Sequence, residues 1–294
     1  MISGVAILGA ERRLRARILL PMKRAALLPV LLCAACSGTG IHLPFASVHA
    51  HAVHRFFPDL DRRENAVRYG RWNALESAWN AGVTAEVDRR LEASFRETMK
   101  REPDYPPDAR LCAPVFAREA PGLFGALFDA DRLEQEVTDA LAATDASPET
   151  TSSRVEKSLE RYRRSRFALA SPAAAPVDPR LSELSTARLL VEGDWLFAHA
   201  AEDLAASAFR DQRWKVKATI DRFDVQFQAP SAPLQSSWYK SFAPTFSGSY
   251  AAAAELFDRA TSFRIEIFQA LLAPDPAARR EAARAVGRRY GISG

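Results

Sequence analysis

The stretch PRLSELSTARLLVEGDWLFAHAAEDLAASAFR, residues 179–210, decides the fold class of this chain. Large apolar side chains recur throughout it: Leu181, Leu184, Leu189, Leu190, Trp195, Leu196 and Leu204. An apolar-rich segment of this length exceeds an ordinary strand and is typical of a buried helix. We therefore predict one long helix from about Pro179 to Arg210.

The segments on both sides of this stretch repeat the helical pattern. We expect further helices over 60–79, 84–101, 131–143, 148–169, 249–273 and 275–290. Asp61, Thr84 and Ser147 are placed to cap three of them, and Ala81-Gly82 ends the first. The sequence therefore predicts an all-α protein, an irregular multi-helix bundle of about eight helices.

Residues 214–227 fit two patterns. Alternation of Trp214, Val216, Ala218 and Ile220 with polar residues indicates a strand, whereas a stripe of Val216, Ile220, Phe223 and Phe227 indicates a helix. The central Asp221-Arg222 lacks the Gly or Asn of a tight hairpin turn. A helix is therefore favoured, and a small β-hairpin is the alternative. The aromatic segment that follows, 229–248, is expected to fold onto the core, with a contact surface as the alternative.

Proline content divides the chain into segments. Residues 171–179 (SPAAAPVDP) hold three prolines among small residues, which is typical of a linker. The linker separates a helical N-terminal half, 59–170, from a helical C-terminal half, 180–294, and we expect the two halves to pack together. Upstream, residues 36–58 are interpreted as a tether and residues 1–35 as a leader.

The leader ends in MKRAALLPVLLCAAC, residues 22–36, which has the layout of a secretion signal. Lys23 and Arg24 give the positive start, residues 25–32 give a short apolar run, and Ala34-Ala35 precede Cys36. The run is shorter than the roughly 20 residues that span a bilayer. Met22 is the expected start of translation, with Met1 as the alternative.

This ending resembles the lipobox of bacterial lipoproteins, although Cys33 stands where the lipobox usually has Leu. The resemblance implies that Cys36 becomes the first residue of the mature chain and carries a lipid. It also implies a place in the cell envelope, and Ser37 after the cysteine favours the outer membrane, facing the periplasm. Secretion without lipid and an uncleaved anchor are the alternatives. The resemblance does not extend into the helical body.

The charge of the mature chain is close to neutral. The full sequence has 40 basic and 36 acidic residues, a net charge of +4. Residues 1–35 hold six basic residues and one acidic residue. Their removal leaves 34 basic and 35 acidic residues, a net charge of −1. Such a balance gives no support to a nucleic-acid partner. Cys112 is then the remaining cysteine of the body, and we expect it to be a small buried residue.

Four of the five histidines lie in the tether, at His42, His49, His51 and His54. His51 and His54 would share one face of a helix, and His49 and His51 one face of an extended chain. Neutral imidazoles bind Zn, Cu or Ni, so His49, His51 and His54 are candidate metal ligands. The alternative, a solvated tether, is favoured, and no cofactor is expected.

His199 is the remaining histidine, within the long predicted helix. On a helix it shares a face with Glu192, Trp195, Glu202 and Asp203. This face could bind a small ligand, or His199 could act as a general base. The favoured alternative is a half-buried His199 paired with Glu202 or Asp203.

No stretch of the sequence matches a complete catalytic motif. Ser237 and Lys240 have the Ser-x-x-Lys spacing of penicillin-binding enzymes, but the Ser-Asp-Asn and Lys-Thr-Gly partners are absent. Together these features predict a lipid-anchored envelope protein that acts by protein–protein contact without catalysis. A periplasmic protein that binds a metal or small ligand, and an envelope enzyme with His199 as base, are the alternatives.

Overall fold

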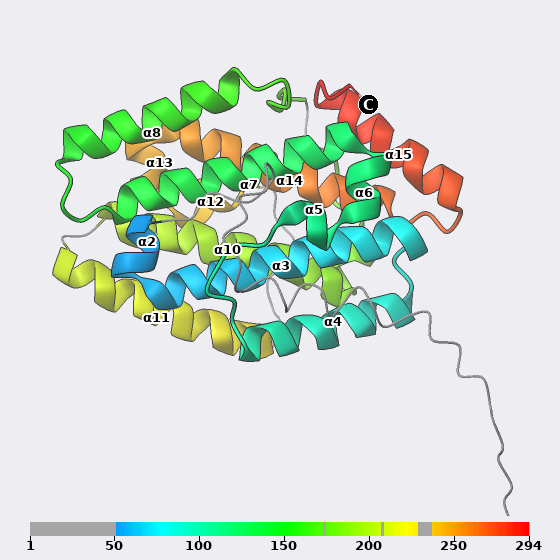
Figure 1. Ribbon diagram of the computed structural model, residues 1–294, viewed down its shortest axis with the longest axis horizontal. Helices are drawn as coiled ribbons and strands as arrows, with labels where there is room; N and C mark the ends of the chain where they lie inside the picture. The colour runs from blue at the N-terminus through cyan, green and yellow to red at the C-terminus, as the bar shows by residue number, and fades with distance from the viewer. Residues whose placement is uncertain (1–50, 173–174, 207–208, 229–236, 294) are drawn as a thin grey trace, which may run out of the picture. The chain divides into compact units, whose positions relative to one another are not determined.

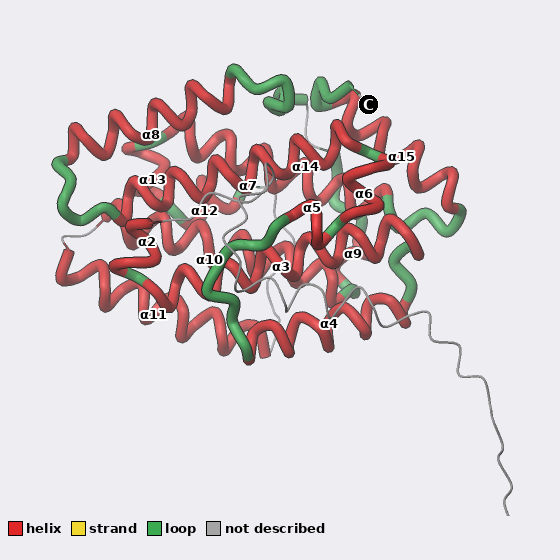
Figure 2. The backbone as a smooth tube through the Cα atoms, viewed as in Figure 1, coloured by secondary structure: helices red, strands yellow, loops and turns green. Residues whose placement is uncertain are grey.

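The computed structural model describes residues 51–172, 175–206, 209–228 and 237–293. These residues form helices and no strands (Figures 1 and 2), which confirms the predicted all-α bundle. The helices are α2 (His51–Phe56), α3 (Pro58–Ala81), α4 (Ala85–Lys100), α5 (Ala109–Cys112), α6 (Pro114–Glu119), α7 (Pro121–Ala142), α8 (Pro148–Arg163), α9 (Pro179–Ser182), α10 (Ser185–Ala206), α11 (Phe209–Gln228), α12 (Trp238–Phe242), α13 (Pro244–Ser249), α14 (Ala251–Ala270) and α15 (Pro276–Arg289).

Helix α10 is the centre of the bundle. It packs against α3, α4, α7, α11, α12, α13 and α14. Leu196, Ala198 and Ala200 of α10 are fully buried, since neighbouring helices surround it (Figure 1). The stretch that predicts the fold class is therefore also the packing centre of the body.

The predicted single helix over 179–210 is wrong at its start. The chain forms the short α9, then α10 from Ser185, because Asp88 of α4 caps α10. Its carboxylate accepts hydrogen bonds from the backbone N–H of Ser185 (2.9 Å) and of Thr186 (2.7 Å). A cap contributed by another helix has no signature in the local sequence.

Most of the predicted helix ends are confirmed, but the helix predicted to begin at 131 begins at Pro121, and the helix predicted to end at 169 ends at Arg163. The hydroxyl oxygens of Thr84 and Ser147 accept from the N–H groups of Val87 and Thr150. Gly82 and Gly291 follow helices with φ of 75° and 77°, which favours glycine. Asp61 as a cap is wrong: α3 begins at Pro58, which leaves Asp61 inside the helix and buried.

Residues 209–228 form helix α11, so the favoured helix is confirmed and the hairpin over 214–227 is wrong. Helix α10 packs along it and supplies the apolar surface that Val216, Ile220 and Phe223 need. The aromatic segment also folds inward where it is described. Trp238, Tyr239 and Phe246 are buried, and they belong to the short helices α12 and α13.

Helices from both sides of residues 171–179 share one core. Helix α10 packs on α3, α4 and α7, and α14 packs on α7 and α8. The described part of the 171–179 segment is itself tied to α14, because Glu266 accepts from the Ala175 N–H and Gln269 donates to the Pro176 carbonyl. Cys112 is buried, as predicted. Among the described helices, none is long and apolar enough to cross a membrane.

Candidate functional site

His199 lies in an aromatic environment on α10. Its ring centroid is 4.1 Å from that of Trp195 and 5.6 Å from that of Phe242. Burial, together with the charge of Arg222, lowers the pKa of His199 to about 4, although Glu202 opposes the change. The imidazole is therefore neutral near pH 7 and is a weak proton acceptor.

The two carboxylates predicted to accompany His199 hold other helices instead. Glu202 accepts hydrogen bonds from the N–H groups of Thr245 (2.8 Å) and Phe246 (3.0 Å), at the start of α13. Asp203 accepts from the hydroxyl of Thr219 on α11 (2.7 Å). Trp195, His199, Glu202 and Asp203 thus lie on one part of α10, but Glu202 and Asp203 are hydrogen-bonded to α13 and α11.

Glu192 is the buried carboxylate of this helix face. Its relative exposure is 5%, and neither carboxylate oxygen has a hydrogen-bond partner among the described residues. Burial raises the pKa of Glu192 to about 8, although Arg188 and Arg96 oppose the change. A carboxyl group in this environment holds its proton near pH 7.

Of the candidate metal ligands, His51 and His54 are described, and both lie on α2. His51 is exposed, whereas the His54 Nδ1 lies 2.8 Å from the Asp61 carboxylate. His42, His49 and the proposed lipid-bearing Cys36 lie outside the described residues. Within the described ranges, no three His, Cys, Asp or Glu side chains gather in a group that could hold a metal ion.

Five charged side chains meet in the centre of the bundle, and the sequence gives no indication of them. We call them the central ion cluster: Arg71 of α3, Asp131 and Glu134 of α7, Asp194 of α10 and Arg264 of α14. Arg264 donates to Asp131 and Glu134 at 2.9 Å each and to Asp194 at 3.1 Å. Arg71 donates to the same Asp194 oxygen at 2.6 Å. The cluster therefore joins four helices.

The central ion cluster is enclosed. A cavity of about 10 Å³ lies beside it, lined by Arg71, Asp131 and Arg264 together with apolar side chains. This volume is about the minimum that one water molecule needs. Burial raises the pKa of Glu134, and Arg264 and Arg71 act against it. The cluster can hold helices together and leaves no room for a substrate.

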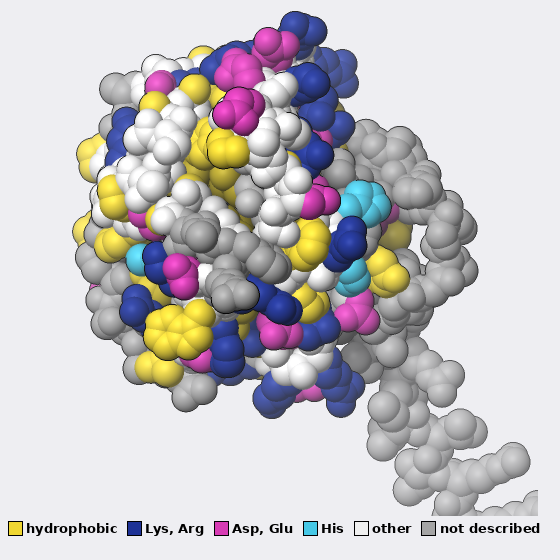
Figure 3. Space-filling model, turned by 90° about the vertical axis from the view of Figure 1, so that its left-hand side faces the viewer, with side chains coloured by type: hydrophobic (Ala, Val, Ile, Leu, Met, Phe, Trp, Pro, Cys, Tyr) yellow, Lys and Arg dark blue, Asp and Glu magenta, His cyan; other side chains and the backbone are white. Residues whose placement is uncertain are grey.

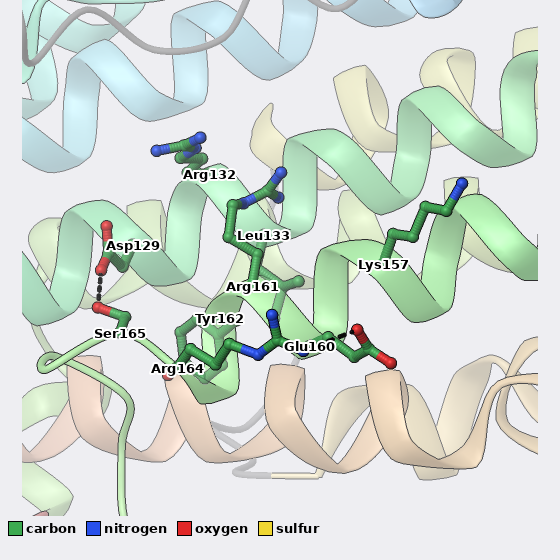
Figure 4. A pocket seen from close by; sticks show the side chains of 9 residues that line it. All are labelled: Asp129, Arg132, Leu133, Lys157, Glu160, Arg161, Tyr162, Arg164 and Ser165. Atoms are coloured by element: carbon green, nitrogen blue, oxygen red, sulfur yellow. Dashed lines mark hydrogen bonds and ion pairs between the residues drawn. The ribbon is translucent and has the colours of Figure 1, made fainter.

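A second hollow lies at the surface, between α7 and α8. We call it the α7–α8 groove; its volume is about 460 Å³. Figure 4 shows the side chains that line it: Asp129, Arg132, Leu133, Lys157, Glu160, Arg161, Tyr162, Arg164 and Ser165. Four of them are cationic and two are anionic.

Both acidic side chains of the groove are engaged. The hydroxyl of Ser165 donates to Asp129, and Arg164 donates to Glu160 at 3.2 Å. Arg132 and Arg161 both contact Glu136, which lies on α7 next to the groove. The face seen in Figure 3 shows a similar mixture of cationic and anionic side chains, with cationic ones at both its upper and its lower edge. The α7–α8 groove therefore combines volume, exposure and cationic charge.

No family model, curated protein or solved structure matches this chain.

Proposed function

We propose that this chain is a lipid-anchored protein of the bacterial cell envelope that acts by protein–protein contact without catalysis. The observation that carries the proposal is the sequence of residues 22–36, where a positive start and a short apolar run lead to Ala34-Ala35-Cys36. Ser37 favours the outer membrane, with the body in the periplasm.

The body suits a contact role because the central ion cluster stabilises the packing of its helices. Arg71 and Arg264 both donate hydrogen bonds to Asp194 in the interior. Such a cluster holds four helices in a fixed arrangement, which preorganises the outer surface for a partner.

The two alternative functions have less support from the geometry. Metal binding through the tether would draw on His54, whose ring is paired with Asp61. Catalysis through His199 would draw on an imidazole placed between Trp195 and Phe242, with a pKa near 4.

A photo-crosslinking experiment in cells tests the contact role. A photoreactive amino acid replaces the exposed Lys157 in the full chain, and a second version carries the additional change Cys36→Ala. We expect one reproducible crosslinked protein with the first version and loss of that product with the second. Crosslinks of equal yield in both versions, or a diffuse set of products in both, would contradict the proposal.

A further inference from the structure

Two arginines from different helices share one carboxylate beside the α7–α8 groove. The Arg132 Nε donates to one oxygen of Glu136 at 3.0 Å, and the guanidinium of Arg161 contacts the other oxygen. Glu136 is an inner residue with 11% side-chain exposure, whereas the two arginines are 39% and 47% exposed. Two positive charges therefore meet one negative charge, and both guanidinium groups remain accessible.

The two guanidinium groups repel each other across the groove. Figure 4 shows Arg161 reaching from α8 toward α7, where Arg132 lies. Burial lowers the pKa of Arg161, and the charge of Arg132 lowers it further. An anion bound between the two groups would relieve this repulsion.

The helix dipole does not account for this arrangement. Cations near a helix C-terminus stabilise it, which explains Arg161 and Arg164 at the end of α8. Arg132, however, lies in the interior of α7, well before its end at Ala142. Its position on the groove is therefore a separate feature of the molecule.

The charges that line the groove favour an anion. Four cations and two acids give a net charge of +2 for the lining, or +1 when Glu136 is included. Lys157 forms no ion pair with a carboxylate in the described part of the chain. The volume of about 460 Å³ lies within the range of small-molecule sites, roughly 300–1,000 Å³.

We infer that the α7–α8 groove binds a phosphate group, with Arg132 and Arg161 as its main ligands and Lys157 as a supporting cation. A guanidinium group presents a planar fork of N–H donors that matches phosphate oxygens. The three terminal oxygens of a phosphate group can accept from both arginines and the lysine, whereas a carboxylate has two oxygens. This inference does not depend on the lipid anchor.

The test is a titration of the purified full chain, in non-ionic detergent, with inorganic phosphate at constant ionic strength. Isothermal calorimetry compares the wild type with the double variant Arg132→Gln/Arg161→Gln and with the control Arg154→Gln. Arg154 lies on α8, is exposed and does not line the groove. Circular dichroism confirms that each variant is folded.

We expect saturable binding to the wild type, at least about tenfold weaker binding to the double variant, and less than a twofold change for Arg154→Gln. Tenfold corresponds to about 1.4 kcal/mol, a modest value for two charge-assisted contacts. Absence of saturable binding to the wild type would overturn the inference. An equal loss in the double variant and in Arg154→Gln would also overturn it, because it would show nonspecific attraction.

A second titration identifies the source of the phosphate. Phosphate binding is measured with the protein on vesicles of phosphatidylglycerol and on vesicles of phosphatidylcholine. A lower apparent affinity on phosphatidylglycerol alone indicates that a lipid headgroup occupies the groove. Equal affinity on both vesicles indicates a soluble phosphate compound. Either result supports a phosphate site, provided that the double variant binds phosphate at least about tenfold more weakly than the wild type.

Discussion

Arg264 of α14 and Asp194 of α10 meet at 3.1 Å in the buried centre of the bundle, although 70 residues separate them in the chain. The same Asp194 oxygen accepts a second hydrogen bond from Arg71 of α3. Each charge compensates the other in a region from which water is largely excluded. The pair is therefore strongly coupled to the packing of three helices.

Replacement of Arg264 tests this coupling. Arg264→Met should lower the free energy of unfolding by about 3–5 kcal/mol, because it leaves buried carboxylates without a compensating charge. Urea denaturation followed by circular dichroism measures the loss. The exposed Arg154→Gln is the control and should change stability by less than about 0.5 kcal/mol. A loss at Arg264 as small as that of the control would show that the cluster contributes little.

Glu192 should make the protein less stable as the pH rises. Its pKa is raised from 4.5 to about 8 by burial, so the folded state favours the protonated form. The stabilisation is complete below pH 4.5 and is lost progressively up to about pH 8. Glu192→Gln cannot ionise. Its free energy of unfolding should therefore rise relative to that of the wild type by up to about 1.4 kcal/mol per pH unit in this window. Denaturation curves at several pH values measure the difference, and parallel pH profiles would contradict the assignment.

The imidazole of His199 should remain neutral across the physiological range. Its pKa is lowered from 6.5 to about 4, so its stabilising effect is present above pH 6.5 and is lost as the pH falls from 6.5 toward 4. Histidine NMR signals identify it by comparison with His199→Gln. We expect little change in its signal between pH 8 and about 5.5. A titration midpoint near 6.5 would show that the ring is solvated.

Asp88 should control the start of α10 from its position on α4. Asp88→Ala removes the acceptor of the Ser185 and Thr186 N–H groups. It should lower the free energy of unfolding by about 1–3 kcal/mol. Hydrogen exchange should rise at the start of α10, around residues 185–188, before other helices respond. Asp88→Asn keeps one acceptor oxygen and should lose less stability than Asp88→Ala. Unchanged protection in Asp88→Ala would mean that α10 begins without this cap.

The helices could be predicted from the sequence because their signals are local. Thr84, Ser147 and Gly82 mark helix ends through contacts within a few residues, and the structure confirms these three ends. The break before α10 could not be predicted, because its cap, Asp88, is almost a hundred residues away. Spacing in one segment carries no information about a partner in another.

The candidate sites were harder to predict because the sequence does not reveal which charges are buried. Arg71 and Arg264 lie on helices among other charged residues and would ordinarily be placed in solvent. Arg132 and Arg161 become a site only when α7 packs against α8. Conversely, Glu202 and Asp203 share a helix face with His199, yet their hydrogen bonds to α13 and α11 depend on tertiary packing.

The most direct test of the proposed function is the intact mass of the native protein extracted from membranes. Our account predicts a chain that begins at Cys36, heavier than residues 36–294 by the mass of the attached lipid. The same protein with Cys36→Ala should lack this added mass. An unmodified chain that begins at Met1 would contradict the lipid anchor, and with it the proposed place of this protein in the cell envelope.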